Sequence, residues 1–121
     1  MGDYAVIILA AGGSSRFGQS KQLLDWNGVS LVAHGADIAL GAELGPVIVV
    51  LGCGASAVRE ALGTRPVQTV MNWRWREGLS TSVQTGLAAL SPEIDAAILM
   101  QCDQPLVTAG LLRSLVACFE G

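Results

Sequence analysis

The sequence predicts an α/β fold, a Rossmann-like doubly wound sheet of mostly parallel strands with helices on both faces. Strand-like and helix-like patterns alternate along all 121 residues, and no long linker, repeat or low-complexity segment interrupts them. Several strand-like segments are continuous apolar runs, which are typical of strands covered on both faces. Because 51% of the residues are hydrophobic, the chain can bury one core, and we expect a single domain over residues 1–121.

The first half of the chain predicts two strands and one helix. The unbroken apolar run Tyr4–Ala10 is the first predicted strand. After a Gly/Ser-rich loop, the pair Asn27-Gly28 predicts a tight turn, and Ser30 is a candidate N-cap for a helix that reaches about Leu40. The apolar run Val47–Leu51 predicts the second strand, and the segment Gly52-Cys53-Gly54 ends it.

The middle of the chain predicts a second strand-and-helix unit. Ser56 is the expected cap of a short helix through Leu62, and Val67–Met71 is the third predicted strand. The segment Asn72–Gly78 is polar and aromatic, which favours a loop. A helix is then expected from Ser80 or Thr81 to Leu90, where Ser91-Pro92 stops it.

The last part predicts one more strand and one more helix. Asp95–Gln101 is the fourth predicted strand, and Thr108 is the candidate cap of a helix reaching Phe119. Ligands of such sheets bind outside the carboxyl ends of the strands, next to the switch point in strand order. If the first strand is central, the loops after the first, third and fourth strands converge on one crevice.

Charge, hydropathy and cysteine usage exclude several classes of protein. The net charge is −3 and the few Lys and Arg residues form no basic stripe, which argues against nucleic acid as a partner. The apolar runs are shorter than the roughly 20 residues that a membrane span needs, and the N-terminus lacks a basic signal region, so we expect a cytoplasmic protein. Cys53, Cys102 and Cys118 include no C-x-x-C pair, which argues for free thiols instead of a disulfide framework or a zinc site.

The loop after the first strand has the composition of a phosphate cradle. Its glycines and serines allow a close backbone approach to a ligand, and Arg16 and Lys21 supply positive charge for an anion. It does not match the P-loop pattern, because Gln19 stands where that pattern needs Lys. It does not match the dinucleotide pattern either, because Ser15 stands where glycine is needed and no acidic residue follows Leu51 to hold a ribose. A glycine-rich turn without a ligand stays open as the simpler alternative.

Two later loops supply further candidate site residues. Asp103 follows the fourth strand, where a carboxylate could hold Mg²⁺ against nucleotide phosphates, or could be an ordinary loop residue or helix cap. Gly78 and the hydroxyls up to Ser82 precede a helix, where they could contact a nucleobase or phosphate or simply cap the helix. Trp73 and Trp75 could cover a substrate or pack against their own domain. His34 lies in a helix pattern without a nucleophile elbow, so a catalytic triad is not expected.

Three ordered motifs give the chain a family resemblance. They are Leu9-Ala10-Ala11-Gly12-x-Ser14-x-Arg16-Phe17-Gly18-x-x-Lys21-Gln22-Leu23-Leu24, Asn72-x-x-Trp75-x-x-Gly78-x-x-x-Ser82 and Cys102-Asp103-Gln104-Pro105. With them the sequence resembles the MobA-like nucleotidyltransferases, and within these the molybdenum cofactor cytidylyltransferase branch. The resemblance implies a Rossmann-like sheet of the nucleotide-diphospho-sugar transferase type. Some members of this fold family are described as oxidoreductases, but the sequence offers no site for a redox cofactor.

The resemblance also implies roles for individual residues. Arg16 and Lys21 would neutralise the triphosphate, Asp103 would bind the catalytic Mg²⁺, and these three are the expected catalytic residues. Ala11, where guanylyl-transferring relatives usually carry glycine, favours cytidine over guanosine. The implied reaction transfers CMP from CTP to a molybdopterin-type cofactor and releases pyrophosphate. The full set of nucleotide-binding positions is Leu9, Ala10, Ala11, Gly12, Gly13, Ser14, Arg16, Lys21, Gly78 and Ser82.

The chain also departs from the family pattern. Family domains continue through further strands, so we expect a domain truncated at its C-terminus, with an open sheet edge that invites pairing with another chain, including a second copy of itself. Two other functions stay open. One is a nucleotidyltransferase acting on a sugar or polyol phosphate, and the other is a non-catalytic nucleotide-binding assembly or chaperone module for molybdenum hydroxylases.

Overall fold

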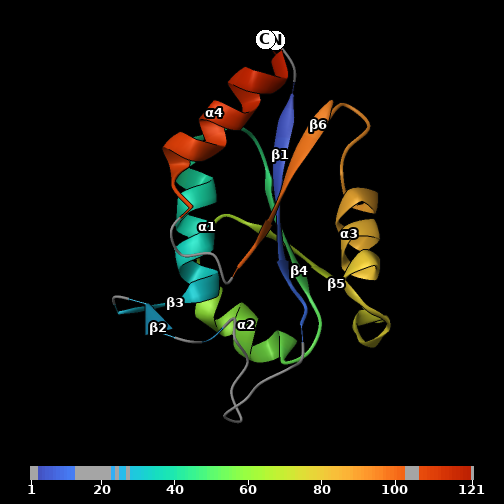
Figure 1. Ribbon diagram of the computed structural model, residues 1–121. Helices are drawn as coiled ribbons and strands as arrows, with labels where there is room; N and C mark the ends of the chain where they lie inside the picture. Colours follow the sequence, from blue (N-terminus) through green and yellow to red (C-terminus); the bar gives the residue numbers. More distant parts are fainter. Residues whose placement is uncertain (1–2, 13–22, 24, 27, 103–106, 121) are drawn as a thin grey trace.

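Four parallel strands form the sheet at the centre of the protein (Figure 1). The computed structural model describes residues 3–12, 23, 25–26, 28–102 and 107–120. The sheet order is β5-β4-β1-β6, and each neighbouring pair is parallel. These strands are β5 (Gln68–Met71), β4 (Val47–Leu51), β1 (Tyr4–Ala10) and β6 (Ala96–Gln101). The predicted fold class and the interior position of the first strand are therefore confirmed.

Strand β1 is buried on both faces because its side chains alternate between two apolar clusters. Val6, Ile8 and Ala10 belong to one cluster. Ile7 and Leu9 belong to the other, together with Ala11 just beyond the strand. Since successive side chains of a strand point to opposite faces, a continuous apolar run is the sequence that such a strand needs.

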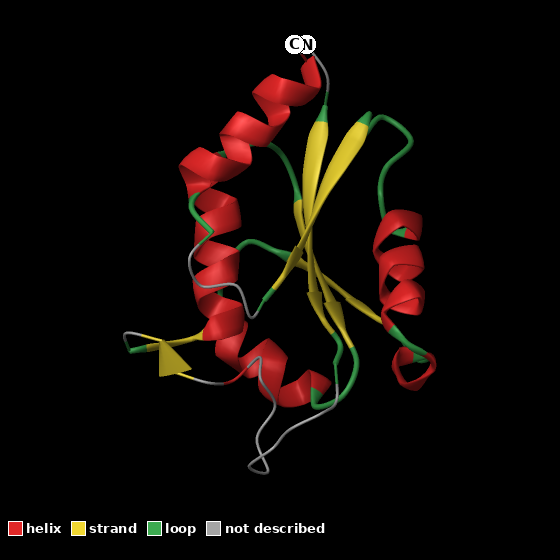
Figure 2. Cartoon of the chain, in the orientation of Figure 1, coloured by secondary structure: helices red, strands yellow, loops and turns green. Residues whose placement is uncertain are grey.

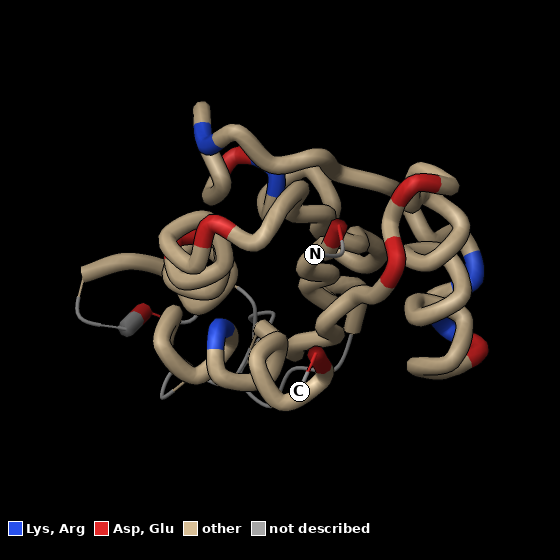
Figure 3. Tube along the Cα trace, turned by 90° about the horizontal axis from the view of Figure 1, so that it is seen from above, with Lys and Arg blue, Asp and Glu red and all other residues tan. Residues whose placement is uncertain are grey.

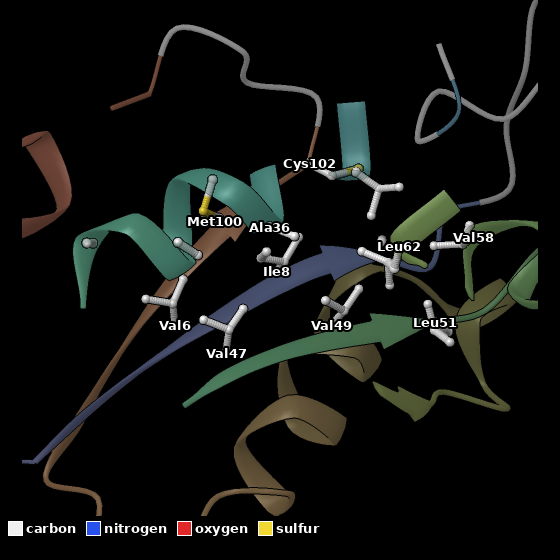
Figure 4. Packing of buried hydrophobic residues seen from close by; sticks show 14 of the residues in the cluster. Val6, Ile8, Ala36, Val47, Val49, Leu51, Val58, Leu62, Met100 and Cys102 are labelled. Carbon is white, nitrogen blue, oxygen red and sulfur yellow. The ribbon is translucent and has the colours of Figure 1, made fainter. Parts of the chain in front are cut away.

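Helices cover both faces of the sheet (Figure 1). Helices α1 (Leu31–Ala42), α2 (Ala55–Leu62) and α4 (Ala109–Glu120) contribute Val32, Val58 and Leu112 to the cluster that contains Val6 and Ile8. Figure 4 shows side chains of β1 and β4 pointing toward Ala36 of α1 and Leu62 of α2. Helix α3 (Leu79–Ala88) covers the opposite face, where Val83 packs on the second cluster.

Two of the predicted helix caps are confirmed. The hydroxyl of Ser30 accepts a hydrogen bond from the backbone N–H of Ala33 at 3.3 Å, and Thr108 Oγ1 accepts one from the N–H of Leu111 at 3.1 Å. These bonds satisfy amide groups that the first turn of a helix leaves without a partner.

Two other predicted helix starts were wrong, because a glycine precedes the helix in each case. Helix α2 begins at Ala55, not after Ser56, and its N-cap is Gly54 with φ 68°. Helix α3 begins at Leu79 instead of Ser80 or Thr81, and its N-cap Gly78 has φ 118°. A residue with positive φ turns the chain sharply into the helix, which only glycine does without strain. Helix α3 also ends at Ala88, before the predicted Leu90.

Two small elements were not predicted. An antiparallel hairpin joins β2 (Asp25–Trp26) to β3 (Val29–Ser30) beside α1 (Figure 2). The turn expected at Asn27-Gly28 falls between them, and Asp25 Oδ2 accepts a hydrogen bond from the N–H of Gly28 at 3.3 Å. Asn27 itself lies outside the described residues. A 3₁₀ turn, η2 (Trp75–Glu77), interrupts the segment predicted as a loop.

Strand β6 is at one edge of the sheet. In the part of the chain that the structure describes, β6 pairs only with β1, and the side chain of its residue Leu99 is exposed.

Cys53, Cys102 and Cys118, all described, form no disulfide, as expected. Across the same part of the chain, no helix is long and apolar enough to cross a membrane.

Candidate nucleotide-binding site

The carboxyl ends of β1, β4 and β5 meet at one place. The backbone N–H of Cys53, after β4, donates to the carbonyl oxygen of Ala11, after β1, at 3.2 Å. The N–H of Asn72, after β5, donates to the carbonyl oxygen of Leu51 at 2.7 Å. Backbone hydrogen bonds therefore continue past the last strand pairs and hold three consecutive strand ends together. Ligands of parallel sheets bind at this edge.

Gly52 lies where the chain after β4 passes between the end of β1 and the loop after β5. A Cβ atom placed on Gly52 would lie 2.7 Å from the carbonyl oxygen of Ala11 and 2.8 Å from the Cβ atoms of both Ala11 and Trp75. Such distances are shorter than any real side chain tolerates. Only glycine therefore lets the chain after β4 pass between Ala11 and Trp75.

The two tryptophans of the aromatic loop after β5 have different environments. Trp75 packs on the apolar cluster that contains Ala11, whereas Trp73 is 83% exposed. The question left open by the sequence therefore has a different answer for each residue. Trp75 packs against its own domain, and Trp73 is available at the surface.

The charges in this loop are partly paired. Arg74 Nη2 lies 2.9 Å from Glu77 Oε1, and this hydrogen-bonded pair lowers the pKa of the Glu77 carboxyl and raises the pKa of the Arg74 guanidinium. The guanidinium of Arg76 lies 5.0 Å from the ring centroid of Trp75, a cation–π contact. Figure 3 shows the described Arg positions on several parts of the Cα trace, with acidic positions among them.

A buried polar cluster joins this loop to the start of α3. Its members are Asn72, Thr81 and Ser82, the polar side chains that are buried among the described residues. Asn72 Nδ2 lies 2.9 Å from Thr81 Oγ1 and 2.9 Å from Ser82 Oγ. Every buried side-chain polar atom described has a hydrogen-bond partner. The cluster fixes the position of Ser82 relative to the end of β5.

The described part of the chain includes six of the predicted nucleotide-binding positions. Leu9, Ala10 and Ala11 are buried at the end of β1. Gly12 is exposed, and a Cβ placed there would meet no atom of the described residues within 4 Å. Gly78 is exposed before α3, and Ser82 is buried in its first turns. The structure thus places these positions around the carboxyl ends of β1 and β5.

The remaining predicted positions are Gly13, Ser14, Arg16, Lys21 and Asp103, and all five lie outside the described residues. Their roles stay predictions. Among the residues that the structure does describe, no group of three or more His, Cys, Asp or Glu side chains could hold a metal ion. The proposed magnesium ligand, Asp103, is not among them.

Two residues of this site were not predicted as functional from the sequence. In the sequence Gly52 marks only the end of a strand, yet in the structure it decides how closely Ala11 and Trp75 approach. Asn72 is only a motif position in the sequence, yet it organises the buried polar cluster. A polar residue directly after a predicted strand is the signal for Asn72, and no local signal distinguishes Gly52 from Gly54.

Comparison with known proteins agrees with this geometry. A family model described as the MobA-like NTP transferase domain matches residues 6–121. A relative named nicotine blue oxidoreductase, from Paenarthrobacter nicotinovorans, is 36% identical over 84 residues, which are 69% of this chain and 41% of that protein. A bifunctional protein GlmU from Paraburkholderia phytofirmans is 35% identical over 112 residues, which are 91% of this chain and 24% of that protein.

A solved structure gives the same result. A nucleotidyl transferase from Methanothermobacter superposes with a TM-score of 0.85 at 30% identity, over 94% of this chain and 56% of that one. The chain therefore spans less than half the length of the two curated relatives and slightly more than half of this structure. The family model covers nearly the whole chain, and the parallel sheet, the strand ends at Ala11 and the three motifs fit it, so this chain belongs to the MobA-like NTP transferase family.

Proposed function

We propose that this chain is the nucleotide-binding part of a nucleotidyltransferase that transfers CMP from CTP to a molybdopterin-type cofactor. The observation that carries the proposal is the meeting of the β1, β4 and β5 ends at Ala11 in a chain of the MobA-like family. Ala11 belongs to the first motif, and its place at this edge of the sheet suits contact with a nucleotide. The description of the family as NTP transferases supports a nucleoside triphosphate as that nucleotide.

In the proposed reaction an oxygen of the acceptor's terminal phosphate attacks the α-phosphorus of CTP. A new P–O bond forms, the bond between the α-phosphorus and the bridging oxygen breaks, and pyrophosphate leaves with the electron pair. Such a transfer needs no protein nucleophile and depends on positioning and charge neutralisation. Arg16 and Lys21 would bind the phosphates and offset the growing negative charge.

Mg²⁺ fits the donor set of the third motif. It prefers oxygen ligands and in nucleotide sites binds one or two carboxylates together with substrate phosphates. Asp103 would be the carboxylate. It follows Cys102 directly in the sequence, and the last pair of β6 with β1 joins Gln101 to Leu9. When bound, the ion would neutralise charge on the phosphates.

One observation argues against a dinucleotide-dependent oxidoreductase, an alternative considered because the name of the P. nicotinovorans relative is nicotine blue oxidoreductase. Strand β4 ends at Leu51, and Gly52, Cys53 and Gly54 follow it. Dinucleotide-binding sheets carry an acidic residue at this position to hold the ribose. This chain offers a glycine and a half-buried cysteine instead.

Calorimetry and product analysis test the proposal. With Mg²⁺ present, the purified protein is expected to bind CTP more tightly than GTP or ATP. When the molybdopterin-type acceptor is added, Lys21→Ala and Asp103→Ala should each lower pyrophosphate release by about 100-fold or more, because each removes a charge used in the transition state. Arg59→Ala and Glu93→Ala, at exposed positions on α2 and before β6, are the matched controls and should release pyrophosphate like the wild type. Equal binding of all three nucleotides, or near-normal turnover by either site variant, would contradict the proposal.

A further inference from the structure

Asn72 has a fixed place at the end of β5. It is 2% exposed, and its backbone N–H donates to Leu51 at 2.7 Å. Its side-chain amide makes three hydrogen bonds. Oδ1 accepts one from the backbone N–H of Arg74 at 2.9 Å. Nδ2 donates to the hydroxyl oxygens of Thr81 and Ser82, each at 2.9 Å. The amide is therefore held on both ends.

The hydrogen bond from the backbone N–H of Arg74 determines which end of the Asn72 amide is the oxygen and which is the NH₂ group. A backbone N–H can only donate, so the group facing Arg74 must be the acceptor, the Oδ1 atom. The NH₂ group then necessarily faces the two hydroxyls, and it can only donate. Thr81 Oγ1 and Ser82 Oγ are thus both acceptors toward Asn72.

The two hydroxyls differ in where their own protons go. Thr81 Oγ1 lies 2.7 Å from the carbonyl oxygen of Gly78 and 2.9 Å from that of Arg74, so its proton has an acceptor. For Ser82 Oγ, the hydrogen bond with Asn72 is the one found among the described residues, and in it Ser82 accepts. The Ser82 proton has no acceptor within that part of the chain, although the residue is only 4% exposed.

We propose that Asn72 is a positioning residue that makes Ser82 a hydrogen-bond donor toward the nucleotide. This inference rests on the proposed function and extends it. Because the Asn72 amide donates to the Ser82 oxygen and the Ser82 proton has no acceptor among the described residues, the hydroxyl favours an acceptor atom on the ligand. Two parts of CTP carry such acceptor atoms. They are the base, with its carbonyl oxygen and ring nitrogen, and the triphosphate, with its oxygens.

A double-mutant cycle on CTP affinity tests the inference. Ser82→Ala removes the donor. Asn72→Asp keeps the size and the acceptor for Arg74 but replaces the NH₂ group by an oxygen, which draws the Ser82 proton inward. Each single variant should weaken CTP binding by about tenfold, as expected for one lost hydrogen bond to a charged or strongly polar group. The double variant should bind no more weakly than either single variant, because both changes remove the same bond.

Controls separate this role from a purely structural one. Thr85→Ala removes a hydroxyl one turn further along α3, where it donates to the Thr81 carbonyl oxygen at 2.8 Å, and should leave CTP affinity within twofold of the wild type. Thermal unfolding of each variant shows whether it is folded. If Asn72→Asp does not fold, Asn72→Ser enters the same cycle, since its shorter side chain cannot reach Ser82. Inorganic tripolyphosphate as a second ligand locates the acceptor atom, because Ser82→Ala weakens its binding only if Ser82 contacts phosphate.

The outcomes distinguish this inference from the proposed function. A wild-type protein that binds no nucleoside triphosphate would overturn the proposed function and the inference that rests on it. A wild type that binds CTP, with Ser82→Ala binding equally tightly, would overturn the inference alone. So would an Asn72 variant that weakens CTP binding as much in the Ser82→Ala background as in the wild type.

Discussion

The backbone N–H of Cys53 donates to the carbonyl oxygen of Ala11 across a distance of 3.2 Å. This bond lies one step beyond the last strand pair, Ala10 with Leu51, and it keeps β1 and β4 together where they leave the sheet. Gly52, between Leu51 and Cys53, passes close to both Ala11 and Trp75. The shape of the candidate site therefore depends on a residue with no side chain.

Gly52→Ala is expected to disturb both stability and binding. Its Cβ would meet the backbone oxygen of Ala11, which cannot move without breaking the bond to Cys53. Overpacking of this kind costs about 1–3 kcal/mol. Denaturant unfolding measures that loss and calorimetry measures CTP affinity, which should fall by about tenfold or more. A variant with unchanged affinity would show that the approach of Ala11 to Trp75 is irrelevant to binding.

Two buried helix glycines should respond in opposite ways to the same substitution. Gly86→Ala would place a Cβ 2.6 Å from Ile7 Cγ2 and 3.2 Å from Val50 Cγ2, so α3 must move away from the sheet, at a cost of about 1–3 kcal/mol. Gly35→Ala in α1 would meet only Met100 Cε at 3.8 Å, an ordinary contact. Because alanine favours helix, Gly35→Ala should stabilise the protein by up to about 1 kcal/mol. Equal denaturant midpoints for the two variants would contradict this difference.

Ala11→Gly should reduce the preference for CTP over GTP. Ala11 is buried in the cluster with Trp75 at the end of β1, where we propose that the nucleotide binds. Removal of its methyl group is expected to leave more room there for the larger guanine base. The measurement is the ratio of CTP to GTP dissociation constants. Ala5→Gly, the same change at the far end of β1 on the same face, is the control and should lower stability without changing the ratio. A ratio that is unchanged in Ala11→Gly would remove Ala11 as a determinant of base preference.

Alkaline pH should weaken the contact between the first strand and the last helix. The hydroxyl of Tyr4 donates to Glu120 Oε2 at 2.6 Å, and this bond, with burial and the negative charges of Glu120 and Asp95, raises the pKa of Tyr4 to about 12. In the unfolded chain the pKa is about 10. Because the unfolded state loses its proton first, this contribution to stability is complete below pH 10 and is lost as the pH rises toward 12.

The protein has one tyrosine, so its ionisation can be followed directly by phenolate absorbance. The folded protein should titrate with a midpoint well above 10. Tyr4→Phe retains the ring that packs edge-on against Phe119, at a centroid distance of 6.1 Å, and should lose less stability than the wild type between pH 9 and pH 12. An absorbance midpoint near 10 in the folded protein would contradict the Tyr4–Glu120 bond.

The strands and most helices could be predicted because their signals are local. The apolar runs Tyr4–Ala10 and Val47–Leu51 are the two interior strands, and Ser30 and Thr108 are helix caps. Capping at Ser56 and Ser80 failed because the preceding glycines, Gly54 and Gly78, adopt positive φ and start the helices themselves. A hydroxyl side chain near a helix start is a local signal, but the backbone turn that competes with it is set by the packing of the helix on the sheet.

The features of the candidate site also separate into those that are local in the sequence and those that depend on the folded structure. By itself the sequence determined the parallel α/β fold, the three motifs and the family, because these depend on residue type and spacing along the chain. Only the tertiary structure decided that Gly52 passes between Ala11 and Trp75, that Trp75 is packed while Trp73 is exposed, and that Asn72 binds Ser82. Those contacts join residues that are not neighbours in the sequence. Whether two such residues touch depends on distances of a few ångströms in the folded protein, which no pattern along the chain encodes.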